Sequence, residues 1–424
     1  MPEPPPDAIW IHPSDVAAEG AAAVCANVKA MGLHSISLAA TYHAGRFLLP
    51  HDPQATVKLL EDGVVYYQVD AARWQKSRLK PKTAEVSEKS DLARAARDAA
   101  VAAGLEVNAW VVGLHNSRLG EANPDCTVQN AFGERYPWAL CPSHPVVRNY
   151  AAALAEEVAA KLEPAALDLE AFGFMGYAHA SHHDKAAVQL DGAHDFLLSL
   201  CFCSSCAKRM AARKVDAAKF AEKARKLVKT FLERGGETKG GALNLPEEIG
   251  PWLAREIGAL ESANVMSARR ETVVSLIAEI RERVAEDVEL HVMAHPSPFV
   301  TGAAIGGGLL ALGELVDGFI LNLFHGDVAR MRAEVRSART AATPTTSFAA
   351  NLRAFPPDST SAASFAEKVA AVRAEGVGEI RVYHYGLMAR AHFDWIAPAL
   401  QPGGRAAGSN SGSNSGSNHG SNHR

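Results

Sequence analysis

Three cysteines stand close together in the sequence Cys201-Phe-Cys203-Ser-Ser-Cys206. Thiolates at this spacing can surround a tetrahedral Zn²⁺ when a fourth ligand comes from elsewhere in the chain. Cys141 and Cys126 are the candidates for that fourth ligand. Three reduced thiols buried at the start of a helix would explain the cluster without a metal. The Cys-x-Cys-x-x-Cys spacing nevertheless favours a structural zinc site.

Two carboxylates, Asp168 and Glu170, lie two residues apart in an apolar run. If this run is a strand, both side chains point to the same face of the sheet. A partly buried carboxyl at the end of a strand can keep its proton near neutral pH and deliver it to a leaving group. We therefore expect Glu170 to be catalytic. Asp168 is a second catalytic candidate, and its alternative role is a structural carboxylate held by arginine or backbone donors.

Polar and aromatic residues recur where the apolar runs end. Imidazoles, amides and aromatic rings suit the hydroxyls and apolar faces of a sugar, and histidines equally suit a catalytic divalent metal. Arg353, Tyr383 and His384 also lie at such ends. The predicted substrate-binding residues are His12, Tyr42, His43, His115, Asn116, His295, Asn322, His325, Asn351 and Tyr385.

The elements that must position these residues form a regular series. Most of the short β-rich runs are apolar almost throughout, as is typical of parallel strands covered on both faces. Stretches with helical spacing separate them, so the pattern predicts a (β/α)8 barrel, with a doubly wound sheet as the alternative. The runs are residues 8–12, 35–43, 106–116, 166–174, 288–295, 318–325, 343–351 and 379–385.

Two insertions and a tail depart from this series. Residues 44–87 interrupt the second unit and contain a strand-like stretch at 64–69. A mostly helical insertion spans about residues 175–287, on the side where βα loops build active sites. Residues 403–424 repeat Gly, Ser and Asn and predict a disordered tail. We therefore expect one catalytic barrel domain over residues 1–402.

The stretch Tyr136-Pro-Trp-Ala-Leu-Cys141-Pro-Ser-His-Pro, the run Ala166-Leu-Asp168-Leu-Glu170 and the three clustered cysteines follow one another in this order. The order resembles that of family 42 glycoside hydrolases, the β-galactosidases. The resemblance covers about a quarter of the chain. It implies zinc held by Cys141, Cys201, Cys203 and Cys206, with Cys126 as the spare, and it implies Glu170 as the acid/base residue.

The chain departs from this family in two places. Leu169 precedes Glu170, where the hydrolase clan usually has Asn, and residues 343–353 contain no Asp or Glu to supply the nucleophile that ends the seventh strand. A retaining enzyme needs that second carboxylate about 5 Å away, whereas an inverting one needs a base about 6.5–9.5 Å away. Asp327, just after the sixth strand, and Asp184, in the loop after the fourth, are the alternatives.

Composition excludes several classes of protein. The 424 residues carry 43 Lys and Arg against 47 Asp and Glu, so the basic excess of a nucleic-acid-binding protein is missing. No uncharged apolar run reaches the length of about 18 residues that a transmembrane helix needs. The first residues lack the pattern of a secretory signal, so we expect a cytoplasmic protein without membrane partners. The near-neutral charge fits an uncharged ligand such as a sugar.

The sequence thus supports three hypotheses. The first is a glycoside hydrolase with a carbohydrate substrate, Glu170 as proton donor and structural zinc. The second is a metal-dependent sugar isomerase or epimerase that binds its ion through His295, His325 and Glu170. The third is a non-catalytic sugar-binding barrel that has lost its nucleophile. A homo-oligomer is compatible with each of them.

Overall fold

Eight parallel strands close into a ring in the computed structural model, which describes residues 6–178, 185–238 and 240–401. Each strand pairs with the next one along the barrel, and the last returns to the first through the register Ala8↔Arg381. The predicted (β/α)8 barrel is confirmed. The strands are β1 (Ala8–Ile11), β2 (Ser35–Tyr42), β7 (Glu106–Val112), β10 (Ala166–Glu170), β11 (Glu289–His295), β13 (Gly318–Asn322), β14 (Ser347–Arg353) and β15 (Glu379–Tyr383).

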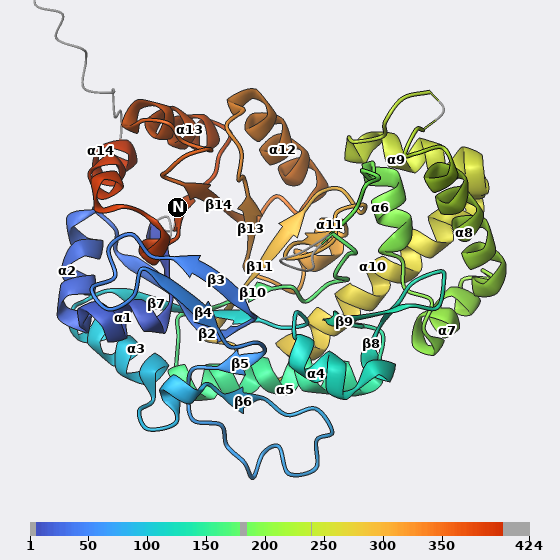
Figure 1. The fold of residues 1–424 in the computed structure, drawn as a ribbon. Coiled ribbons are helices and arrows are strands. Elements are labelled where there is room, and N and C mark those ends of the chain that lie inside the picture. Colours follow the sequence, from blue (N-terminus) through green and yellow to red (C-terminus); the bar gives the residue numbers. More distant parts are fainter. Residues whose placement is uncertain (1–5, 179–184, 239, 402–424) are drawn as a thin grey trace, which may run out of the picture.

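Helices surround the ring and explain why the strands are apolar on both faces (Figure 1). All eight residues of β2 are buried, because side chains alternate between the barrel interior and the helix layer. Acidic or hydroxyl side chains cap several helices, as Asp91 does for α3 and Ser361 for α13. The surrounding helices are α1 (Pro13–Glu19), α2 (Ala21–Ala30), α3 (Leu92–Ala102), α5 (Pro145–Leu162), α10 (Ala259–Arg281), α12 (Val328–Ala341), α13 (Ala362–Ala374) and α14 (Ile396–Leu400).

Between β10 and β11 the chain builds a second helical layer to one side of the barrel (Figure 1). Its helices are α6 (Gly192–Leu198), α7 (Ser204–Ala212), α8 (Ala217–Glu233) and α9 (Pro246–Leu253), which lead into α10. Their apolar faces enclose a separate hydrophobic core that includes Phe196, Met210, Phe220 and Trp252. The described residues therefore form two hydrophobic cores, one in the barrel and one in this layer.

The shorter insertion after β2 contains two antiparallel strands, β3 (Gly45–Leu48) and β4 (Val57–Leu60), followed by β5 (Val64–Val65) and β6 (Lys82–Thr83). The buried carboxylate of Glu157 on α5 holds the loop between β5 and β6. It accepts hydrogen bonds from the Trp74 Nε1 at 2.8 Å, the Tyr67 hydroxyl at 3.1 Å and the Asp70 amide at 2.8 Å. A fully satisfied buried carboxylate makes this long loop part of the rigid fold.

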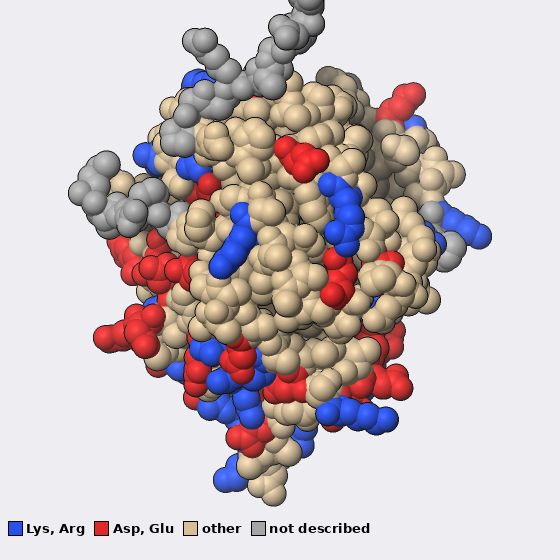
Figure 2. Space-filling view, turned by 90° about the vertical axis from the view of Figure 1, so that its left-hand side faces the viewer, with Lys and Arg blue, Asp and Glu red and all other residues tan. Residues whose placement is uncertain are grey.

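The surface carries charges of both signs. On the face shown in Figure 2, Lys and Arg side chains lie interspersed with Asp and Glu. Within the described ranges, none of the helices combines the length and the apolar character needed to cross a lipid bilayer. The predicted tail at 403–424, together with Asp184 and the histidines at 179–183, lies outside the described residues.

Candidate active site and cysteine centre

Glu170 is the last residue of β10, at the carboxyl end of the barrel, and its side chain is almost fully enclosed, with 8% of the residue exposed. Its Oε2 accepts a hydrogen bond of 2.7 Å from the Trp110 indole Nε1 on the neighbouring β7. Burial raises the pKa of Glu170 to about 7, and the Trp110 hydrogen bond partly opposes this rise. The carboxyl can therefore exchange a proton near neutral pH, as a general acid/base requires.

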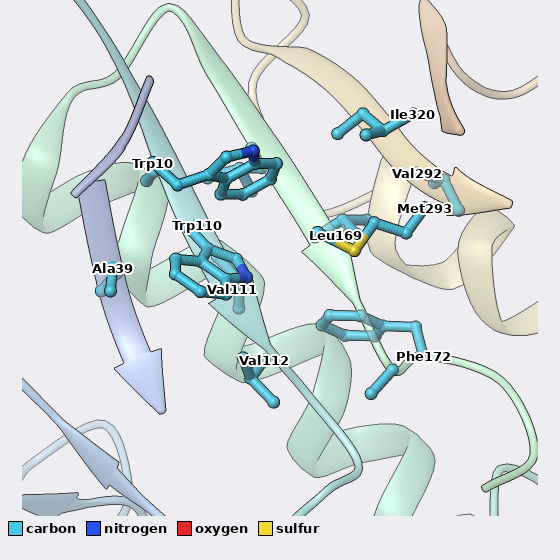
Figure 3. Packing of buried hydrophobic residues seen from close by; sticks show 14 of the residues in the cluster. Trp10, Ala39, Trp110, Val111, Val112, Leu169, Phe172, Val292, Met293 and Ile320 are labelled. Carbon is cyan, nitrogen blue, oxygen red and sulfur yellow. The ribbon is translucent and has the colours of Figure 1, made fainter. Parts of the chain in front are cut away.

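Aromatic rings surround this carboxyl. The Trp10 and Trp110 rings meet edge to face at a centroid distance of 4.8 Å, and Figure 3 shows both indoles side by side inside the barrel. The Tyr42 ring meets Trp110 at 4.9 Å, and the Tyr383 ring does so at 6.2 Å. Burial raises the pKa of both tyrosines, and the nearby Glu170 carboxylate raises it further. Both phenols therefore stay protonated and can act as hydrogen-bond donors.

A chain of side-chain hydrogen bonds links β1, β14 and β13 across the barrel from Glu170. The Trp10 Nε1 donates to Asn351 Oδ1 at 2.9 Å, and the Asn351 Nδ2 donates to Asn322 Oδ1 at 2.8 Å. Beside them, the Arg353 guanidinium lies 4.1 Å from the centre of the Phe324 ring. The predicted residues Asn322 and Asn351 are thus brought together at the mouth. The seventh barrel strand, β14, contains no Asp or Glu.

Asp168 lies one layer deeper and is completely buried. Its carboxylate pairs with Arg381 at 2.5 Å and with His291 at 3.3 Å, and it accepts a hydrogen bond of 2.6 Å from the Ser37 hydroxyl. Burial opposes ionisation of this carboxyl, but the adjacent Arg381 prevails and lowers its pKa. These contacts fit the structural role that the sequence left open for Asp168.

Other predicted residues cap helices. His12 follows β1, and its Nδ1 accepts from the Ser14 amide at the start of α1 at 3.2 Å. Asn116 accepts from the Leu119 amide at 2.9 Å and so caps α4 (Ser117–Ala122). Asp327 is exposed and accepts from the Arg330 amide at 3.0 Å at the start of α12.

Tyr385 is placed away from the mouth. Its hydroxyl donates to Glu19 at 3.1 Å and accepts from Asn27 at 2.8 Å, so it contacts α1 and α2. The mouth instead receives Tyr383, two residues earlier. The reason is the strand register: the barrel interior takes Glu379, Arg381 and Tyr383, and β15 ends there.

The remaining histidines are dispersed. The His43 and His115 rings stack at 4.1 Å, while His295 accepts from the Ser297 amide at 3.0 Å and His325 pairs with Glu334 at 3.3 Å. In the part of the chain that the structure describes, neither His295 nor His325 belongs to a group of three or more side chains able to share a metal ion. The ion site of a sugar isomerase, with Glu170 as third ligand, is therefore not assembled.

Four cysteines do form such a group. Cys141 follows β9 (Arg135–Leu140), and Cys201, Cys203 and Cys206 lie at the start of α7, with all four buried. The Cys141 sulfur lies 3.6 Å from that of Cys203, 3.6 Å from that of Cys206 and 3.7 Å from that of Cys201. A tetrahedron with metal–sulfur bonds of about 2.3 Å has edges of about 3.8 Å, so these four thiols fit a single metal ion. Cys126 stands apart and faces His144 at 3.8 Å.

Tyr42 and Tyr383 were named from the sequence, but the two indole rings beside Glu170 were not. Trp10 and Trp110 occupy the middle of apolar runs, where a tryptophan that serves a site looks like one that fills a core. The register that pairs Trp110 with Asp168 on the adjacent strand, and so gives both side chains the same inward face, becomes visible only in the structure.

No protein-family profile matches the chain, and no curated protein sequence does. Solved structures align over most of it. The glycoside hydrolase domain of PgaB (BpsB) from Bordetella bronchiseptica shares 15% identity at a TM-score of 0.53, covering 94% of this chain and 100% of that domain. The catalytic domain of β-amylase from Paenibacillus polymyxa shares 11% sequence identity at a TM-score of 0.54. The alignment covers 93% of this chain and 99% of the β-amylase domain.

A third similar structure is α-L-fucosidase isoenzyme 2 from Paenibacillus thiaminolyticus, with 13% identity and a TM-score of 0.53. The alignment covers 92% of this chain but 48% of the fucosidase, so the chain spans about half the length of that enzyme. At such low identities these likenesses show a shared fold.

Proposed function

We propose that this chain is a glycoside hydrolase with Glu170 as its general acid/base. The observation that carries the proposal is the enclosed Glu170 carboxyl, whose pKa is raised to about 7 by burial, at the carboxyl end of a barrel strand. Barrel enzymes place their chemistry at this end. The similar structures named above carry glycosidase names, and the cysteine order resembles that of family 42, which supports the same reading.

In this mechanism the protonated Glu170 gives its proton to the glycosidic oxygen while the bond from that oxygen to the anomeric carbon breaks. The Trp110 indole holds the carboxyl in place through its hydrogen bond of 2.7 Å. The ring of Tyr383 and the amide of Asn322, which are only partly buried, suit the apolar face and the hydroxyls of a sugar. The leaving group departs as a neutral alcohol, and a water molecule supplies the new hydroxyl.

Asp327 is our candidate for the base that accepts the proton of that water. It follows β13, the barrel strand next to β14, and β14 itself offers no carboxylate. An inverting mechanism tolerates the wider separation of the two carboxyl groups.

We assign zinc to Cys141, Cys201, Cys203 and Cys206. A tetrathiolate site leaves no coordination position open, so the metal would supply structure and take no part in the chemistry. The Gln129 amide donates to the Cys201 sulfur at 3.4 Å, and the Cys206 thiol donates to Ser143 at 3.2 Å, so neighbouring groups already orient the sulfurs.

The test uses Glu170→Gln and glycosides that differ in their leaving groups. Because a poor leaving group needs the proton most, the variant should lose about 10²–10⁴-fold in kcat/KM on alkyl glycosides and much less on dinitrophenyl glycosides. Glu282→Gln, at an exposed glutamate, is the control. Equal losses on both substrates would argue against proton donation, and full activity would reject the role of Glu170.

A non-catalytic sugar-binding barrel is the second candidate, and the absence of a carboxylate from β14 favours it. It predicts saturable binding of a glycan, measured by calorimetry, with no hydrolysis of any glycoside by the wild-type protein.

A further inference from the structure

A cavity of about 160 Å³ lies between α10 and the loops that follow β10 and β11. Two arginines, Arg269 and Arg270, line it together with apolar side chains such as Phe174, Met266 and Pro298. Among the described residues that line this cavity there is no Asp or Glu. The cavity therefore combines apolar walls with two arginines, and its described lining contains no carboxylate.

Arg269 is partly buried and is the more enclosed of the two arginines. Its Nη1 atom is shielded from solvent and has no hydrogen-bond partner among the described residues, and its guanidinium lies 4.3 Å from the centre of the Phe174 ring and 5.3 Å from that of Phe196. Within the described ranges, Arg269 forms no ion pair with a carboxylate, in contrast to the buried Arg381 in the barrel. A buried guanidinium N–H without an acceptor is costly, so this group is suited to an anionic partner.

Arg270 reaches the same cavity from the exposed side of α10 and, in the part of the chain described, has no carboxylate partner either. The loop that faces it contains Gly308, with φ +80°, where a Cβ atom would lie 3.0 Å from the Arg270 Cγ. Glycine therefore lets the backbone approach the arginine closely. Both arginines line the same cavity from adjacent positions of one helix.

We propose that this cavity binds the oxyanion of a small organic acid, either a carboxylate or a phosphate ester, through Arg269 and Arg270. Guanidinium groups match both anions in geometry and can hold them by two hydrogen bonds. The volume of about 160 Å³ corresponds to about five water molecules, which accommodates the anionic end of a ligand and a few more atoms. Phe174 and Pro298 then face the uncharged part. This site is separate from Glu170 and does not depend on the proposed hydrolase activity.

The cysteine centre offers a competing explanation for Arg269, because the thiols at Cys141, Cys201 and Cys206 also act on its charge. If Arg269 only balances the charge of a metal–thiolate centre, then Arg270 has no role in that function. The lack of acidic residues in the cavity would then be irrelevant to it. The two explanations therefore make different predictions for Arg270 and for ligand binding.

Titration calorimetry on the full chain, with its metal content measured, tests the proposal with glucuronate, glucose 6-phosphate, inorganic phosphate and neutral glucose. We expect at least one oxyanion to bind in a way that depends on Arg269 and Arg270, whereas any binding of glucose, for example at the Glu170 site, should be unchanged in the arginine variants. Preference for glucuronate would identify a carboxylate ligand, and preference for either phosphate compound would identify a phosphate ligand. Arg270→Gln should weaken binding about tenfold and Arg269→Met should abolish it, since each removes charged hydrogen bonds.

Arg255→Gln is the matched control, because Arg255 lies exposed just before α10 and pairs with Glu256 instead. It should bind the oxyanion as the wild-type protein does. The proposal is overturned if none of the three anions binds at millimolar concentration, or if binding persists in the double variant of Arg269 and Arg270. A change in metal content alone, in Arg269→Met, would assign that arginine to the cysteine centre.

Discussion

Trp110 and Glu170 are joined by a hydrogen bond of 2.7 Å between neighbouring barrel strands, although Trp110 is paired in register with Asp168 and not with Glu170. The indole of Trp110 therefore points towards the mouth of the barrel, to the residue two positions beyond its register partner. Its N–H stabilises the ionised form of a carboxyl that burial otherwise keeps protonated. Burial is the larger influence on the pKa of Glu170, and this contact partly offsets it.

Replacing Trp110 by phenylalanine should raise the pKa of Glu170 further above 7, by about one unit, because a hydrogen bond to a charged group is lost. Carbon-13 NMR of protein labelled at glutamate carboxyls would measure the shift without a substrate. Trp10→Phe is the matched control, since the Trp10 indole bonds to Asn351. An unchanged titration in Trp110→Phe, or an equal shift in both variants, would contradict this account.

Glu170→Gln should make stability less dependent on pH. The pKa of Glu170 is raised from 4.5 to about 7 on folding, so the folded state holds the proton more tightly than the unfolded state. The stabilising contribution is therefore complete below about pH 4.5 and is lost as pH rises through 7. Between pH 5 and pH 8, the free energy of unfolding of the Glu170→Gln variant should therefore rise by on the order of 3 kcal/mol relative to that of the wild-type protein. Urea unfolding at both pH values measures this gain, and a constant difference would refute it.

Asp327→Asn separates helix capping from chemistry, since Asn caps a helix about as well as Asp. If Asp327 is the base, kcat should fall at least about 100-fold while the free energy of unfolding changes by less than about 0.5 kcal/mol. Asp216→Asn, at the cap of α8, provides the control. Normal turnover in Asp327→Asn would leave this residue with its capping role alone.

Asp168→Asn should lower the free energy of unfolding. The change removes the charge that faces the buried Arg381 at 2.5 Å and so should cost on the order of 3 kcal/mol. Chemical denaturation measures the loss, and His291→Gln, which alters the same network, should show a non-additive effect in the double variant. A fully stable but inactive Asp168→Asn protein would instead point to catalysis.

Cys141→Ser should remove the metal. We expect about one zinc ion per wild-type chain by elemental analysis and almost none in the variant, with a lower melting temperature, because a structural zinc site contributes directly to folding. Cys25→Ser, in α2, and Cys126→Ser should both keep the metal. Retained zinc in Cys141→Ser would exclude this residue as a ligand.

The repeating apolar runs were enough to predict the barrel, because strands buried on both faces and helices with one apolar face leave distinct patterns. Their exact bounds were harder to predict. The seventh run was expected at 343–351, whereas β14 is Ser347–Arg353. Pro344 lacks an amide hydrogen for the sheet, and the residues around it form a turn in which the Thr343 and Thr346 hydroxyls are hydrogen-bonded.

The candidate site was predictable where local spacing fixes geometry. The three clustered cysteines lie close together because they span one helix start, and Glu170 follows from its place at the end of a strand. Tyr385 was misplaced because the chain turns after Tyr383, and alternation no longer holds beyond a strand end. The partners of Asp168 come from distant strands, so no local pattern contains them.

Helix α7 takes part in both hydrophobic cores, since Cys206 belongs to the barrel core and Met210, one turn later, to the core of the helical layer. The four-cysteine centre therefore lies where the two hydrophobic cores meet, and we expect each core to unfold as one unit. With the metal bound, we expect both units to unfold in one transition. Without it, the helical layer should open first, so chelation would turn a single melting curve into two steps and expose α8 to proteases before the barrel.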